Sequence, residues 1–148
     1  PEGDLLHRRL IPPPMLNEDV YGMALHLAGE LTFLDATVNS DYRERAGYLL
    51  PVICRQCEGA ENACRREKGL EPVSLPDAVP YSMRSDFPLS APLATVAALG
   101  LASLLVADEN PDLCAALQEQ YTQSRSGVLA QLPAQCGQIA DRYPAIWQ

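Results

Sequence analysis

Two adjacent amphipathic helices are predicted between Ser90 and Leu132, and they constrain the fold more than any other part of the 148-residue chain. Ser90 can cap the first helix, and Pro92 falls in its first turn, where a missing N–H costs nothing. Apolar residues then recur at spacings of three and four, namely Leu93, Val96, Ala97, Leu101, Leu104 and Leu105. Such spacing puts them on one face of a helix, and that face must be buried.

A second helix is expected to start only a few residues later. Asn110, Pro111 and Asp112 match an N-cap, a proline at the first helical position and an acid at the positive end of the helix dipole. The apolar face of this helix contains Leu113, Cys114, Leu117, Tyr121 and Val128. Because the connection is short, the two helices are predicted to be antiparallel neighbours that share a core.

Two more helical patterns precede this hairpin. Asn17 is a candidate N-cap for a helix over about Glu18 to Glu30, where apolar residues recur with helical spacing. Ser40 and Asp41 are candidate caps of a longer helix that would stop at Gly69. The sequence therefore predicts an all-α fold, a small bundle of about four helices with the antiparallel hairpin at its centre.

Pro51 interrupts the longer of these helices. A proline inside a helix removes one hydrogen bond, and its ring clashes with the carbonyl group four residues earlier, here that of Gly47. A kink near Gly47 to Pro51 is expected within an otherwise continuous element, with two separate helices as the alternative.

A long extended loop is predicted between Leu70 and Ser90. Four prolines prevent a helix there, and loops of this length in compact domains are usually functional. We expect either a short hairpin or an extended arm that lies across the core or across a neighbouring subunit. The candidate loop contacts are Val79, Tyr81, Met83 and Phe87.

The two ends of the chain differ from the middle. Residues 1–14 contain three consecutive prolines and are predicted to be extended or disordered, which leaves residues 15–136 as the helical domain. Residues 137–148 form a predicted docking tail. Its candidate partner-binding residues are Ile139, Tyr143, Ile146 and Trp147, because aromatic residues often anchor interfaces. The alternative is that the tail folds back on its own core.

Three of the five cysteines, Cys54, Cys57 and Cys64, lie on the longer helix. The Cys-x-x-Cys pair invites a metal or redox interpretation, but the chain offers no second ligand pair at comparable spacing. These cysteines share a helical face with apolar neighbours, so core packing is favoured. No metal site and no cofactor are expected.

The chain carries 11 Lys and Arg against 19 Asp and Glu, for a net charge of -8. This balance argues against a nucleic-acid backbone or an anionic membrane as the main partner. There is no long apolar run and no pattern of a secretory signal, so neither membrane insertion nor export is expected. No phosphate-binding loop, nucleophile elbow or histidine with a spaced acid is present, and no catalytic residue is predicted.

Several stretches together resemble the head-to-tail connector, or adaptor, proteins of long-tailed double-stranded-DNA bacteriophages. They are LNEDVYGMALHLAGE, DYRERAGYLLPVICRQ, PLATVAALGLASLLVADENPDLCAALQEQYTQ and the tail string IADRYP. The resemblance covers about Met15 to Tyr143 and consists of a pattern of helices, a hinge and a tail.

This resemblance implies a virion protein of the neck region, made in the bacterial cytoplasm. Its copies would form a ring, typically of twelve, below the portal protein, and the ring would dock the next neck or tail-completion protein. DNA would pass through the ring without specific binding. The loop at Leu70 to Ser90 and the tail at residues 137–148 would grip the portal or neighbouring subunits.

A small helical regulatory or interaction protein without catalysis is the alternative. Such a protein is expected to form a dimer through an isologous face, whereas a ring needs a heterologous interface. A helical DNA-binding module is disfavoured by the charge, because only Arg65, Arg66 and Lys68 form a basic cluster.

Overall fold

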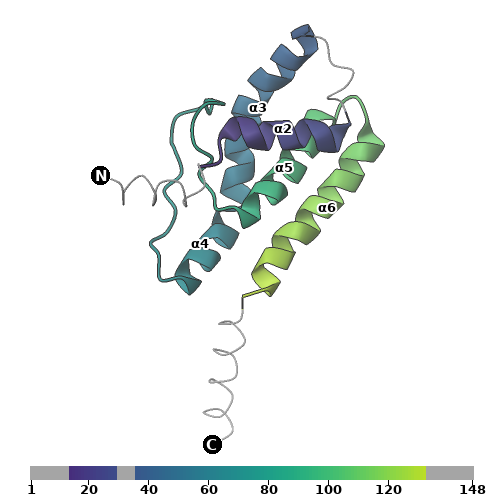
Figure 1. Cartoon of the computed structure of the whole chain (residues 1–148). Helices are drawn as coiled ribbons and strands as arrows, with labels where there is room; N and C mark the ends of the chain where they lie inside the picture. Colours follow the sequence, from purple (N-terminus) through teal and green to yellow (C-terminus); the bar gives the residue numbers. More distant parts are fainter. Residues whose placement is uncertain (1–13, 30–35, 133–148) are drawn as a thin grey trace, which may run out of the picture.

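The computed structural model describes residues 14–29 and 36–132, which form five α-helices and one long extended segment (Figure 1). The helices are α2 (Asn17–Ala28), α3 (Ala36–Gln56), α4 (Glu58–Glu67), α5 (Pro92–Leu105) and α6 (Pro111–Ala130). The described ranges contain no strand and only an isolated bridge between Leu16 and Asp86. The prediction of an all-α fold is confirmed for these residues. None of the helices in them has both the length and the apolar character needed to cross a bilayer.

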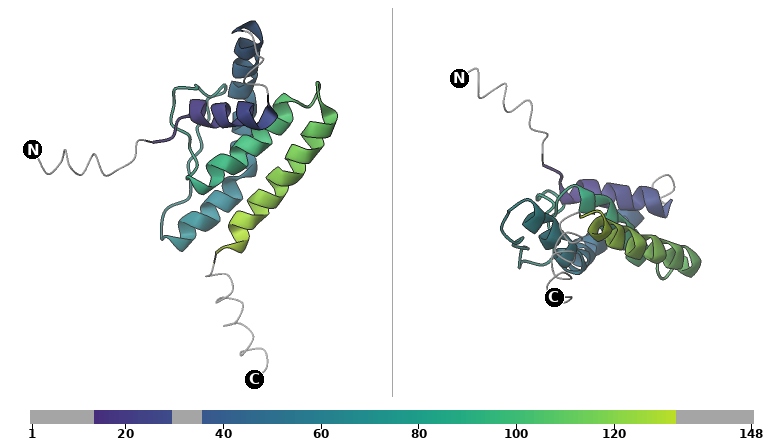
Figure 2. Two further views of the ribbon diagram at one scale, coloured as in Figure 1. Left: turned by 45° about the vertical axis from the view of Figure 1, so that its right-hand side comes forward. Right: turned by 90° about the horizontal axis from the view of Figure 1, so that it is seen from below.

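Helix α5 lies at the centre of the molecule and packs against α2, α3 and α6 (Figures 1 and 2). Its buried residues surround the helix axis: Leu93, Ala94, Val96, Ala97, Ala98, Leu99, Gly100, Leu101, Ala102, Ser103 and Leu105. The expected single apolar face was too narrow, and Leu104, placed on it, is only half-buried. A helix that is apolar on all sides belongs in a core, which explains the difference.

Gly100 marks the point where three helices meet. A Cβ atom at this position would lie 2.9 Å from Ile53 Cδ1 of α3 and 2.9 Å from Tyr121 Cε1 of α6. The buried hydroxyl of Tyr121 donates a hydrogen bond of 2.7 Å to Gln56 Oε1 at the end of α3. The glycine therefore allows α3, α5 and α6 to approach more closely than any side chain there would permit.

Helix α6 begins as expected, because the backbone N–H of Leu113 donates to Asn110 Oδ1 at 3.1 Å. The helix runs back alongside α5 (Figure 1). Just before it, Glu109 Oε2 accepts a 2.6 Å hydrogen bond from the hydroxyl of Tyr42, which ties the turn to α3. On α6 itself only Leu117 and Tyr121 are buried, and most of its outer surface is exposed.

Two predicted helix starts are wrong. Helix α3 begins at Ala36, so Ser40 and Asp41 lie inside the helix and cap nothing. Asn17 is the first residue of α2, and Leu16 precedes it as the capping residue. The amide of Asn17 is buried and donates from Nδ2 to the backbone oxygen of Ser82, a partner 65 residues away that local sequence cannot indicate.

The long helical pattern was expected to be one element with a kink near Pro51, with two separate helices as the alternative. Pro51 sits inside α3, and the chain leaves the helix only at Cys57, where φ is -93° and ψ is -2°. The longer element is thus two helices, α3 and α4. The helix continues past Pro51 because another segment satisfies the carbonyl group that the proline leaves free, as described below.

Cys54 and Cys57 are fully buried in the core, and Cys64 is half-buried. Burial raises the pKa of the Cys54 thiol to about 12, with a smaller contribution from the neighbouring Cys57. Burial likewise raises the pKa of Cys57, partly offset by the Tyr121 hydroxyl and the charge of Arg125. Both side chains are therefore neutral thiols near pH 7 and act as small apolar groups.

Candidate interaction surface

The extended segment Leu70–Ser90 lies across α2, α3 and α4 of the same chain (Figure 1). It has no strand pairing to itself, so of the two expected arrangements the hairpin is not formed. Its apolar residues Tyr81, Met83, Phe87 and Leu89 are buried in the main core. The segment is therefore part of the folded body, and hydrogen bonds at both ends and in the middle hold it there.

The middle of the segment is bound to α3 where Pro51 interrupts the helical hydrogen bonds. Because proline has no N–H, the carbonyl oxygen of Gly47, four residues earlier, has no intrahelical donor. The backbone N–H of Tyr81 supplies one at 2.8 Å. A Cβ atom at Gly47 would lie 3.1 Å from both Pro80 Cβ and Tyr81 O, so glycine makes this close approach possible.

Replacing Gly47 with alanine is expected to loosen the segment. The added methyl group would push residues 80–81 away and weaken a hydrogen bond whose loss costs about 1 kcal/mol, or roughly fivefold in local opening. Cleavage within residues 70–90 by a protease at low concentration should therefore be roughly fivefold faster. Gly59→Ala is the control, because a Cβ atom there meets nothing within 4 Å. Equal cleavage rates for the two variants would refute this anchor.

A second anchor lies at the start of α2. The first N–H groups of a helix have no partner within the helix. Here the N–H of Asn17 donates to Ser85 O at 2.9 Å, and that of Glu18 donates to Met83 O at 2.8 Å. In the opposite direction, Phe87 N–H donates to Met15 O at 2.7 Å. The extended segment thus caps α2 with its own backbone.

The two ends of the segment are bound by α4. Near the beginning, Val73 N–H donates to Asn62 Oδ1 at 2.8 Å. At the far end, Glu61 Oε2 accepts from Ser90 N at 3.1 Å and from Ser90 Oγ at 2.6 Å. The other oxygen of Glu61 pairs with Arg65 Nε at 3.0 Å. Two neighbouring residues of α4 therefore fix where the segment starts and where it enters α5.

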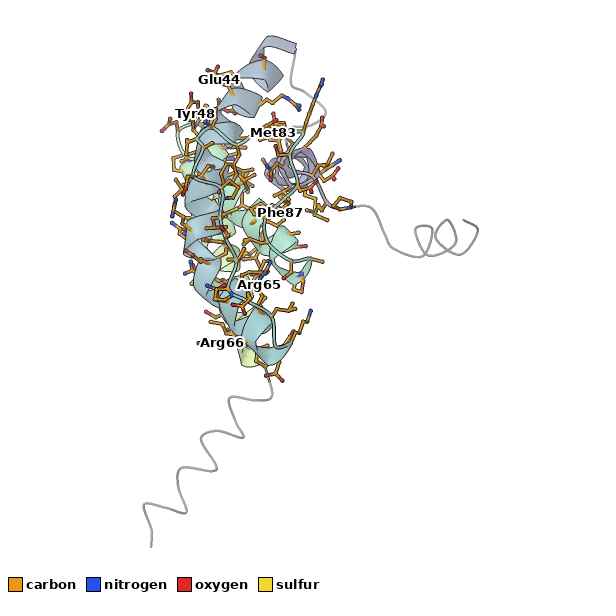
Figure 3. The ribbon with its side chains drawn as sticks, turned by 90° about the vertical axis from the view of Figure 1, so that its left-hand side faces the viewer. Glu44, Tyr48, Arg65, Arg66, Met83 and Phe87 are labelled. Carbon is orange, nitrogen blue, oxygen red and sulfur yellow. The ribbon has the colours of Figure 1, made fainter. Side chains whose placement is uncertain are left out.

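A shallow groove of about 450 Å³ lies between the first half of α3 and residues 80–84. It is lined by Ser40, Arg43, Glu44, Gly47, Tyr48, Pro80, Tyr81, Ser82, Met83 and Arg84. Figure 3 shows Glu44 and Tyr48 on the outer edge of α3, and Met83 on the side that faces α2. Tyr48 is 52% exposed, an unusual position for a large aromatic side chain. The groove therefore combines apolar, hydrogen-bonding and charged side chains.

The predicted loop contacts separate into two kinds. Val79 is 55% exposed and available to a partner, whereas Tyr81, Met83 and Phe87 pack inside their own chain. The predicted tail residues Ile139, Tyr143, Ile146 and Trp147 lie outside the described residues. Partner binding at these positions stays a prediction.

In residues 14–29 and 36–132, no group of three or more His, Cys, Asp or Glu side chains could hold a metal ion. Two arginines of α3 already interact within the chain. Arg43 forms an ion pair with Glu18 at 3.3 Å, and the guanidinium of Arg45 lies over the ring of Tyr42.

Sequence reasoning missed Gly47, Tyr48, Glu61 and Asn62 as parts of this surface. The burial of Glu61 could have been predicted from the helical spacing, since Glu61 lies four residues after Cys57 and one after Ala60, on the buried side of α4. An acid on such a face needs a buried partner. No local signal identifies Asn62, whose partner Val73 lies in the extended segment. No protein-family model, curated protein or solved structure matched this chain.

Proposed function

We propose that this protein is a non-enzymatic structural component of a phage virion, the adaptor between the portal protein and the next neck or tail component. Copies would form a ring that continues the DNA channel and offers a docking surface below the portal. The sequence resemblance over about Met15 to Tyr143 suggests this role.

The observation that carries the proposal is the combination of a rigid helical body with a long extended segment bound to it. The antiparallel pair α5 and α6 serves as the rigid part of a bundle. The extended segment contributes four side chains to the core and also adds outer surface, with Val79 exposed and residues 80–84 lining the groove beside Tyr48. A subunit of a closed ring needs both properties, because each copy must present two different surfaces to its neighbours.

Light scattering tests the proposal directly. The mass of the full-length protein is measured alone and with the portal protein of the same phage or prophage. The adaptor role predicts a large ring-sized assembly that contains portal. A stable dimer that ignores portal would instead support the helical regulatory protein, which is expected to use an isologous face.

Removing residues 137–148 is expected to leave the monomer helical but to prevent its attachment to portal. The tail contains the only tryptophan, Trp147, together with Tyr143, and such residues often supply most of the binding energy of an interface. Circular dichroism checks the fold, and co-sedimentation with portal checks attachment. The matched control removes residues 1–13 instead and should attach normally. Normal attachment of the tail-less protein would show that the tail assignment is wrong.

A further inference from the structure

Helix α3 carries an exposed apolar strip that no described residue covers. Tyr48 is 52% exposed and Val52 is 46% exposed, and both point out of the bundle one helical turn apart. The exposed Arg55 follows Val52 by three residues, and the exposed Glu44 lies one turn before Tyr48 on the same strip. Tyr48, Val52 and Arg55 are called the α3 outer face. Large apolar side chains that gather on one exposed strip mark an interaction site more often than isolated ones do.

Helix α6 has an exposed strip of complementary character. Asp112, Ala116 and Glu119 follow the same spacing of four and then three residues, and all three are exposed. They are called the α6 outer face. The α3 outer face carries two bulky side chains and a positive charge, whereas the α6 outer face carries one small side chain and two negative charges. The two faces are therefore complementary in size at Val52 and Ala116 and in charge at Arg55 and Glu119.

We propose that the α3 outer face of one copy binds the α6 outer face of the next copy of this chain. This inference rests on the proposed ring and names the surfaces that would close it. The contact is heterologous, so each copy keeps one free face of each kind, and a chain of copies can close into a ring.

The common spacing gives the contact a definite register. When Val52 packs on Ala116, the backbones can approach to about 8–10 Å because alanine leaves room for the larger side chain. Three residues further along each helix, the guanidinium of Arg55 then faces the carboxylate of Glu119. One turn earlier, the Tyr48 hydroxyl faces the acidic first turn of α6.

The arrangement of the helices suits this pairing. In Figures 1 and 2, α3 and α6 run in the same general direction, and within one copy they meet beside Gly100. A neighbour rotated about an axis along these helices therefore brings its α6 beside α3 with the same polarity. The hinge and α6 together carry Asp108, Glu109, Asp112 and Glu119 against the single cation Arg125. The negative charge of that side favours approach to Arg55.

Charge reversal in the full-length protein tests the contact. Arg55→Glu and Glu119→Arg are each expected to raise the dissociation constant of self-association about tenfold, since each puts like charges in contact. The double variant restores an opposite pair and should return to within about threefold of the wild type. Light scattering over a series of protein concentrations, alone and on portal, gives the constants.

Two controls remove the effect of net charge. Glu67→Arg changes the charge as Glu119→Arg does, and Lys68→Glu changes it as Arg55→Glu does, but both lie at the exposed end of α4 outside either face. They should leave self-association unchanged. The proposal is overturned if single reversals behave as wild type, if the double variant is not rescued, or if the wild type never self-associates.

The test separates this inference from the adaptor role. If copies assemble on portal regardless of all four reversals, the adaptor role stands and the subunit contact lies elsewhere. If self-association follows the expected pattern while portal has no effect, the contact stands and the adaptor role is refuted. Loss of portal binding in Arg55→Glu alone, with Glu119→Arg unaffected, would assign the α3 outer face to portal and overturn the inference.

Discussion

Replacing Gly100 with leucine is expected to lower the free energy of unfolding by about 3 kcal/mol, the upper end of the usual cost of over-packing a filled core. Even a single Cβ atom there would lie 2.9 Å from Ile53 and 2.9 Å from Tyr121. The larger isobutyl group must displace both side chains, and with them the contact of α5 with α3 and α6. The urea midpoint, with its slope unchanged, measures the loss.

Alanine variants at two glycines separate packing from helix propensity. Gly100→Ala is expected to lower the free energy of unfolding by about 1 kcal/mol, because the clash outweighs the better propensity of alanine. Gly127→Ala makes the same chemical change inside α6, where a Cβ atom meets nothing within 4 Å. It should raise the free energy of unfolding by about 0.5–1 kcal/mol. A shift in the same direction for both variants would refute the packing explanation.

The helices were predictable from the sequence where the signals are local. The cap at Asn110 with Pro111 after it and the apolar spacing of α5 each follow from a few neighbouring residues. In a helix cap, a nearby side chain forms the hydrogen bond that a terminal backbone N–H lacks. That bond does not depend on the rest of the fold, so the local sequence predicts it correctly.

The predictions failed where a distant segment replaces a local partner. The long helical pattern is divided at Cys57, for which no signal was found, and not at Pro51, where Tyr81 donates to the carbonyl oxygen of Gly47 from outside the helix. Asn17 does not cap α2, because its side chain binds Ser82 and backbone groups of the extended segment cap the helix. A single sequence does not indicate these pairs, since each joins residues more than thirty positions apart.

For the candidate interaction surface, the sequence indicated which segment was involved but not which of its side chains face outward. Four prolines and several apolar residues marked Leu70–Ser90 as unusual, and the structure binds it across three helices. Which side chains of the segment face outward depends on how its backbone lies on the helices. Tyr81 and Met83 are buried and Ser82 and Arg84 are exposed because the backbone passes close to Gly47. The helical spacing does signal the exposure of Tyr48, because it lies two residues from the buried Ala46 and Leu50 and therefore on the opposite side of α3.

Replacing Glu61 with alanine is expected to lower the free energy of unfolding by about 3 kcal/mol, although the residue is polar and lies on a short helix. Its side chain is only 1% exposed and accepts three hydrogen bonds, two of them from Ser90 and one from Arg65. Without it, the N–H and hydroxyl of Ser90 lose their partner close to the start of α5, which costs about 1–3 kcal/mol. Hydrogen exchange of the Ser90 amide should accelerate together with the fall in the urea midpoint.

A comparison with Arg65→Ala decides what Glu61 contributes. Arg65→Ala removes the cation beside a carboxylate that is only 1% exposed, while the two hydrogen bonds from Ser90 to that carboxylate remain. We therefore expect Arg65→Ala to cost about 2 kcal/mol, less than Glu61→Ala, because the Ser90 donors still stabilise the buried charge. Glu67→Ala, on the exposed end of the same helix, should stay within about 0.5 kcal/mol of the wild type. If Arg65→Ala costs as much as Glu61→Ala, the ion pair is the main contribution, and the connection between α4 and α5 does not depend on Ser90.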